Sequence, residues 1–409
     1  MKSAVALLLF LAGAAFASPA PSNSATVPIT LDHDRIIVDV RLPLPDGTTK
    51  RVRAWVDNGN PDLWITENVA KLMNLPLSSE TREHIGGKGR TAQAPRAVIL
   101  GGMEISFAGI KEAKATAADA VGPGLSAEIN LPSSVLRNYD ILINYPDREF
   151  TIAAPGTLKF EGVKSKLLLN SENGLVQVPS KLENKNYNFG LDVGTPVSFL
   201  SGALLADFER AHPDWPHMTG AISIANLWGM SDEAHAQLLK APRLQFGPVA
   251  LTDVIFSTLP TDIMEFIQKR AGMETAGLLG ASALINYRVG LDYKHETLYL
   301  DLRNFYKPRD MDVIGFILRP ELDGRYTILG IADYDGKPSV PEAQPGDVLI
   351  SSDGARATGA TMGQVWSSLE GNPGQTRKLV LDRAGKQIEV DATVRHFLGD
   401  TSSDKDKKH

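Results

Sequence analysis

The chain has 409 residues, of which 43% are hydrophobic and 22% charged, so it is long enough for two or three ordinary folded domains. A formal net charge of -6 and a pI near 5.8 argue against nucleic acid or an anionic membrane surface as a partner, because both require basic surface. The sequence contains no cysteine, which excludes disulfide bonds and thiol redox chemistry.

Residues 1–17 have the pattern of a cleavable export signal. Lys2 precedes an apolar run from Ala4 to Phe16, and small residues flank Phe16 at the expected cleavage site. The run is shorter than the roughly 20 residues that a membrane-spanning helix needs. We therefore expect a protein exported to the periplasm or the medium, with a retained N-terminal anchor as the alternative and no other integral membrane segment.

From Thr26 to about Leu302, short β-type runs such as RIIVDVRL, RVRAWV and DILINY alternate with Gly, Pro, Asn and Asp. This pattern predicts a mainly β fold. Helices are expected only in three short segments of this region: ENVAKLMNL after residue 66, GALLADFERAH after residue 201, and TDIMEFIQKRAG from residue 261.

An internal repeat organises this region. The segments 57–66 and 192–201 both read D-x-G-x-P-x-x-aromatic-aliphatic-hydroxyl, and each precedes a predicted helix. Further along, NYDILINYPDREFTI from Asn138 matches NYRVGLDYKHETLYL from Asn286. The repeat predicts two related lobes over residues 26–155 and 156–308.

The pattern of residues changes after Pro308. Residues 310–397 predict a compact unit with its own core, so we expect the two lobes to stay folded when this unit is deleted. Residues 398–409 form the polar end of the chain, and we expect a disordered tail there.

The duplicated D-x-G turns resemble those of the pepsin-like and retropepsin-like aspartic proteases, over roughly residues 30–302. In that family each lobe contributes one aspartate, and the two turns meet at the lobe interface. The resemblance implies that Asp57 and Asp192 are the catalytic pair. The residues that would support the two turns are Asn58, Gly59, Asn60, Val193, Gly194 and Thr195.

Two adjacent carboxylates cannot both ionise easily, so one acts as a base toward water while the other acts as an acid toward the peptide carbonyl. The resemblance thus implies a peptidase that needs no metal or cofactor, acts on peptides or proteins, and works best below neutral pH. Asp-Asn-Gly is also a common turn sequence, and Val193 lacks the hydroxyl that the family places there. The alternative is therefore a catalytically inactive protein of this fold that binds peptides or proteins.

Residues 310–397 resemble a PDZ domain, a module that binds an extended peptide along a sheet edge. Gly315-Phe316 is similar to the end of its carboxylate-binding loop, residues 344–349 to its PGDVI turn, and residues 362–369 to its groove helix. Peptide-binding candidates are Gly315, Phe316, Ile317, Leu318, Val365 and Leu369. The spacing of Val365 and Leu369 fits a core position equally well.

The sequence offers no other recognisable site. The eight histidines show no H-x-x-x-H or H-E-x-x-H spacing, so we expect no metal. Two glycine-containing stretches, around Gly86 and over residues 220–229, are candidates for a flap above the cleft and equally for plain surface loops.

Overall fold

The computed structural model describes residues 22–84, 87–117, 127–303 and 310–399, so residues 1–17, where the sequence predicts an export signal, lie outside these ranges. The fold is mainly β, as the sequence predicts. Within the described ranges, every helix is too short or too polar to cross a membrane.

A ten-stranded sheet contains the first D-x-G turn. Its spatial order is β6-β7-β10-β5-β11-β4-β3-β8-β9, with β2 paired to β3. Asp57 ends strand β4, and helix α1 (Glu67–Leu72) follows strand β5, capped by the Thr66 hydroxyl. The strands are β2 (Thr30–Asp32), β3 (Arg35–Pro43), β4 (Thr49–Asp57), β5 (Trp64–Thr66), β6 (Leu77–His84), β7 (Gly87–Gln93), β8 (Ala97–Leu100), β9 (Met103–Ser106), β10 (Glu112–Thr116) and β11 (Ile129–Pro132).

An eight-stranded sheet contains the second turn, in the order β15-β16-β17-β22-β18-β21-β20-β19. Strand β17 ends at Leu191, and the Ser201 hydroxyl caps helix α3 (Gly202–Ala211), as Thr66 caps α1. The strands are β15 (Leu168–Leu169), β16 (Val176–Leu182), β17 (Lys185–Leu191), β18 (Ser198–Leu200), β19 (His217–Thr219), β20 (Gln237–Phe246), β21 (Val249–Thr258) and β22 (Gly277–Leu279).

The two sheets repeat one local topology around the aspartates. Strand β11 runs parallel to β4 and antiparallel to β5, just as β22 runs parallel to β17 and antiparallel to β18. The pairs β5–β10 and β18–β21 are both parallel. The internal repeat that the sequence shows is therefore also a repeat of strand connections.

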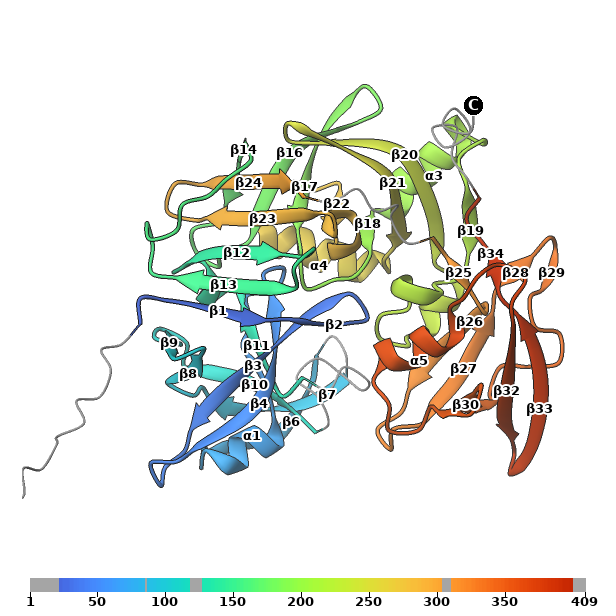
Figure 1. The fold of residues 1–409 in the computed structure, drawn as a ribbon, viewed down its shortest axis with the longest axis horizontal. Coiled ribbons are helices and arrows are strands. Elements are labelled where there is room, and N and C mark those ends of the chain that lie inside the picture. The colour runs from blue at the N-terminus through green and yellow to red at the C-terminus, as the bar shows by residue number, and fades with distance from the viewer. Residues whose placement is uncertain (1–21, 85–86, 118–126, 304–309, 400–409) are drawn as a thin grey trace, which may run out of the picture.

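A third sheet joins these two regions, in the order β1-β13-β12-β23-β24-β14 (Figure 1). Its central pairing brings the two repeated closing segments together, with Leu142 opposite Gly290. The strands are β1 (Ser24–Pro28), β12 (Asp140–Asn144), β13 (Glu149–Ala153), β14 (Val163–Lys166), β23 (Tyr287–Asp292) and β24 (Thr297–Leu302), and helices α2 (Ser133–Leu136) and α4 (Thr261–Ala271) lie outside the sheets.

Residues after 310 form a further unit, drawn in orange to red in Figure 1. Its main sheet has the order β26-β27-β30-β32-β33, with β31 beside β30, and the capping box of Thr361 starts helix α5 (Met362–Leu369). Its strands are β25 (Asp312–Val313), β26 (Phe316–Pro320), β27 (Tyr326–Ile331), β28 (Asp333–Tyr334), β29 (Lys337–Pro338), β30 (Val348–Ser352), β31 (Ala355–Arg356), β32 (Thr376–Arg383), β33 (Lys386–Thr393) and β34 (Arg395–His396).

The core of this C-terminal unit continues into the rest of the chain. Apolar side chains of residues 221–227, between β19 and β20, belong to the same buried cluster as Phe316, Trp366 and Leu369. The sequence predicts a separate core for residues 310–397, but the structure places part of that core on the other side of the boundary. Leu398 is also buried, so the ordered chain extends past the predicted start of the tail at 398.

We expect deletion of everything after Asp310 to leave the remaining chain poorly folded, because Ile222, Ile224 and Leu227 would lose their apolar cover. The truncated protein should bind a hydrophobic dye such as ANS and unfold over a broad temperature range. A sharp thermal transition without dye binding would show that the chain up to Asp310 folds without the C-terminal unit. The same deletion carrying Ile222→Ser and Ile224→Ser should bind less dye.

Candidate active site

Two tight turns bring Asp57 and Asp192 to the junction between the ten-stranded and eight-stranded sheets. Asp57 is the last residue of β4 and Asp192 directly follows β17, and the final residues of both strands are buried, so packing sets the position of each aspartate's backbone. The main chain then continues through Gly59 or Gly194, where the opposite turn approaches most closely. These contacts show why glycine is needed at both positions.

The space around the two glycines shows how closely the two carboxylates approach each other. A methyl group at Gly59 would lie 2.0 Å from Asp192 Cγ, and one at Gly194 would lie 2.6 Å from Asp57 Oδ1 and 3.1 Å from Asp192 Oδ1. Each glycine thus packs on the aspartate of the opposite turn, and both carboxylates meet at Gly194.

The side chain of Asn58 ties the two turns together. Its Nδ2 donates to the carbonyl of Leu191 at 3.0 Å, and its Oδ1 accepts from the backbone N–H of Val193 at 2.7 Å. Asn58 is fully buried, so both bonds form away from water. The amide therefore acts as both donor and acceptor across the junction.

The side chain of Val193 makes no matching hydrogen bond to the first turn, because it is apolar. It is 1% exposed and lies in the main core. Trp55, on strand β4, adds a further bond in the same direction as Asn58: its Nε1 donates to the carbonyl of Gly194 at 3.2 Å. The two turns are thus fixed by one amide and one indole.

The environment of the pair raises both pKa values. Burial, followed by the charge of Asp192, raises the pKa of Asp57 well above its ordinary value, although the amides of Asn130 and Asn60 oppose this shift. Burial also raises the pKa of Asp192 to about 6, although the backbone N–H groups of Gly194 and Thr195 favour its ionised form. Both aspartates have hydrogen-bond donors, but only the pKa of Asp57 is raised further by the charge of its neighbour, so Asp192 ionises first and Asp57 second.

A buried cation lies beside the pair. Arg35, at the start of β3, is 3% exposed, and its Nη2 donates to the carbonyl of Leu227 at 3.1 Å. Burial lowers its pKa to about 10, and the nearby carboxylates of Asp32, Glu233 and the aspartate pair oppose this shift. Arg35 therefore remains charged at neutral pH and favours the ionised form of either aspartate.

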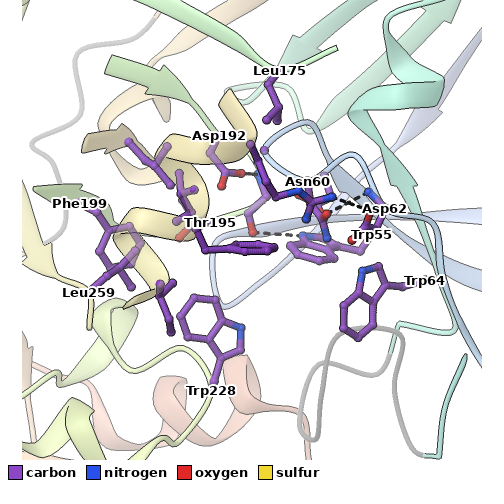
Figure 2. A pocket seen from close by; sticks show the side chains of 18 of the residues that line it. Trp55, Asn60, Asp62, Trp64, Leu175, Asp192, Thr195, Phe199, Trp228 and Leu259 are labelled. Carbon is purple, nitrogen blue, oxygen red and sulfur yellow. Dashed lines mark hydrogen bonds and ion pairs between the residues drawn. The ribbon is translucent and has the colours of Figure 1, made fainter. Parts of the chain in front are cut away.

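The pair opens into a cleft of about 410 Å³ (Figure 2). Its wall is mostly apolar, and Figure 2 shows Trp55, Trp64 and Trp228 along it, with Phe199 and Leu259 together on another side. Helix α4 contributes Ile263, Phe266, Ile267 and Arg270. The space has the size and character of a site for apolar side chains next to a polar reacting group.

Ion pairs link the cleft wall across the junction. Asp62, after the first turn, binds Arg270 of α4 at 2.6 Å and also pairs with Lys114 of β10. Burial raises the pKa of Asp62, but its bonds to these two cations outweigh the effect and leave that pKa below its ordinary value. Asp62 is therefore a structural anion and not a second proton carrier.

The remaining predicted turn residues, Asn60 and Thr195, are found next to the aspartate pair. Asn60 and Thr195 line the cleft, and their backbone carbonyls accept equivalent bonds from Ser133 and Ala281 at 2.9 and 2.8 Å. Of the two flap candidates, Gly86 lies outside the described residues, whereas residues 220–229 pack on the C-terminal unit and place Trp228 in the cleft.

The predicted peptide-binding residues come together in the C-terminal unit but are covered. Phe316, Ile317, Leu318, Val365 and Leu369 are each at most 1% exposed, in one cluster with residues 221–227. Gly315 packs on Phe397 and Ser339. Val365 and Leu369 are core residues here, which was the other interpretation of their spacing.

Sequence reasoning missed Arg35 and the cleft-lining face of α4, and it did not single out Trp228 within the candidate flap 220–229. No motif marks Arg35, since it begins an ordinary β run, and only its burial beside the carboxylates distinguishes it. The helix of α4 was predicted, and its apolar residues at 263, 266 and 267 carry a detectable periodic signal.

No protein-family model matches the chain, and a search of curated proteins finds no relative. Among the described residues, no group of three or more potential ligands could hold a metal ion.

We expect Asn58→Ala to lower the free energy of unfolding by about 2 kcal/mol, because it leaves a buried carbonyl and N–H unpaired. Asn58→Thr should recover more than half of this loss, since a hydroxyl can also donate to Leu191 and accept from Val193. Urea unfolding measures both, with the exposed Asn186→Ala as the control. Equal stability of Asn58→Ala and the wild type would contradict the role of the amide.

The raised pKa of Asp192 also has a consequence for stability. The folded protein holds the Asp192 proton more tightly than the unfolded chain, so the contribution of this group to stability is fully present below about pH 4 and is lost as the pH rises through about 6. Asp192→Asn should therefore match the wild type at pH 4 and exceed it at pH 7.5 by on the order of 2 kcal/mol. Thermal unfolding at both pH values tests this, with the exposed Asp214→Asn as the control. An equal effect of Asp192→Asn at the two pH values would contradict the pKa shift.

Proposed function

We propose that the protein is an exported aspartic-type endopeptidase in which Asp57 and Asp192 share one proton. The observation that carries the proposal is the convergence of the two carboxylates on Gly194 from two repeats of one topology. A six-stranded sheet shared by the repeats and the amide bridge of Asn58 give further support, because both hold the turns in fixed register.

In the proposed reaction, ionised Asp192 removes a proton from water as the water oxygen attacks the peptide carbonyl carbon. Protonated Asp57 gives its proton to the carbonyl oxygen, which yields a neutral tetrahedral diol. Protonated Asp192 then gives its proton to the amide nitrogen while ionised Asp57 takes one from a diol hydroxyl, so the C–N bond breaks to give an acid and an amine and the pair returns to its starting state. No covalent intermediate forms on the protein.

The pKa shifts define the working range of this pair. The pair becomes singly protonated once Asp192 has lost its proton, which happens near pH 6, and it stays so until Asp57 ionises at higher pH. Burial thus moves the expected optimum to near neutrality, higher than the sequence alone suggests.

The substrates in this proposal are peptides or unfolded proteins, which an apolar cleft of about 410 Å³ suits. The alternative, a peptide-binding protein without catalysis, is favoured by Val193, which provides no hydroxyl at the second turn. Export to the periplasm or the medium rests on residues 1–17 and is part of the proposal.

The proposal is tested by incubating the protein with reduced, alkylated serum albumin between pH 4 and 8. The wild type should cleave it best at about pH 6–7, and Asp57→Asn and Asp192→Asn should each lower the rate at least about a thousandfold, because the pair acts as a unit. Asp214→Asn is the matched control.

A peptide with a hydroxyl in place of the scissile amide should inhibit the wild type. Binding of this peptide without any cleavage by the wild type would favour the inactive alternative. Cleavage that survives both aspartate substitutions would place the reaction elsewhere.

A further inference from the structure

The segment between β19 and β20, residues 220–236, lies between the C-terminal unit and the cleft. Strand β26 (Phe316–Pro320) forms one end of the unit's main sheet, and the outward N–H and C=O groups of such an edge need partners. Asn226 supplies them: its Oδ1 accepts from Leu318 N and its Nδ2 donates to Leu318 O, both at 3.0 Å. A side-chain amide has the donor and acceptor of a peptide group, so Asn226 stands in for one residue of an added strand.

The backbone of residues 227–229 is also held by hydrogen bonds to side chains. Glu233, which is buried, accepts from the N–H groups of Leu227, Trp228 and Gly229 at 2.9 to 3.0 Å, and also from Asn226 Nδ2 at 2.6 Å. Arg35 binds the Leu227 carbonyl. Every peptide group flanking Trp228 is thus fixed by a side chain.

A second contact with the edge strand follows directly after Trp228. Gly229 has a φ of 68°, and a methyl group there would lie 2.5 Å from Cα of Arg319. The chain therefore touches β26 just before Trp228, through Asn226, and just after it, through Gly229. The residues before and after Trp228 both contact the C-terminal unit, so the position of the indole depends on that unit.

The indole separates two spaces. Trp228, Phe199 and Leu259 line the cleft that holds the aspartate pair, and the same three residues line a second cavity of about 240 Å³. Behind Trp228 that cavity is bounded by Ala225, Met230 and Ala236. Removal of the indole would join the second cavity to the cleft.

We propose that Trp228 is a specificity-determining residue of the cleft and that Asn226 is the positioning residue that holds it, through its bonds to Leu318 of the C-terminal unit. The inference rests on the proposed peptidase function for its substrate, a polypeptide that places an apolar side chain against the indole. The C-terminal unit then acts as a part of the cleft wall: its edge strand is occupied by the chain's own loop, and its effect is on which side chains the cleft accepts.

The experiment profiles cleavage of a peptide library by the wild type and three variants. Trp228→Ala should raise kcat/KM for peptides with an aromatic residue, relative to leucine, about tenfold at one position near the scissile bond, because the joined space admits a larger side chain. Asn226→Ala should change the preference at the same position in the same direction. Ser352→Ala is the matched control, since it removes from a buried residue of the C-terminal unit a part-buried bond, from Ser352 Oγ to the Ser368 carbonyl at 2.7 Å, away from β26.

A second readout needs no activity. The chain has five tryptophans, so the protein labelled with 5-fluorotryptophan should give five fluorine signals, of which Trp228→Phe identifies one. In Asn226→Ala that signal should shift or broaden while the other four stay, and in Ser352→Ala all five should stay.

The outcomes separate the two proposals. An unchanged profile in Trp228→Ala overturns the specificity role, and a uniform loss of rate with an unmoved fluorine signal in Asn226→Ala overturns the positioning role. A wild type that cleaves no peptide overturns the proposed function and the specificity role with it, whereas the fluorine spectra still decide whether Asn226 positions Trp228.

Discussion

The amide of Asn58 is the interaction on which the candidate site depends. Two carboxylates converge where two sheets meet, and their mutual repulsion, once ionised, would drive the turns apart. Asn58 opposes this by binding a donor and an acceptor of the opposite turn in a buried place, where an unmade bond is costly. A hydroxyl could make the same two bonds, so the amide is one of several chemical solutions to the same constraint.

Charges of alternating sign surround the aspartate pair. Asp57 and Asp192 face the cleft, Arg35 lies next to them, and Asp32 and Glu233 lie close enough to favour its charge. Asp32 and Glu233 are themselves satisfied by other parts of the chain: Asp32 accepts from Thr361 and Gly363 of the C-terminal unit at 2.9 and 3.0 Å. The electrostatics of the aspartate pair thus extend, through the guanidinium of Arg35 and the carboxylate of Asp32, to the C-terminal unit, whose residues Thr361 and Gly363 lie 329 and 331 positions after Asp32.

Much of this arrangement could be predicted from the sequence. The D-x-G repeats and the repeated closing strands are local patterns, and the structure repeats the strand connections around them. The short helices predicted after residues 66 and 201 both form, and the structure shows that the hydroxyls of Thr66 and Ser201 cap them.

The rest depends on contacts between distant segments, which no local pattern encodes. Arg35 looks like any charged residue at the start of a strand, and Asn226 looks like a loop asparagine. The candidate groove of the C-terminal unit was read from residues that do come together, but the sequence gives no sign that residues 221–227 cover them. The bond from Trp55 to Gly194 is likewise visible only once the two turns face each other.

The shared core also constrains the order of events when the chain is made. Residues 221–227 are complete long before the strands that cover them, and at about 5–20 residues per second the last hundred residues take roughly 5–20 s to synthesise. During that interval Ile222, Ile224 and Leu227 have no final place to pack. The cleft wall around Trp228 is therefore the last part of the candidate site to form, and a nascent chain has its two aspartates before it has the surface that faces them.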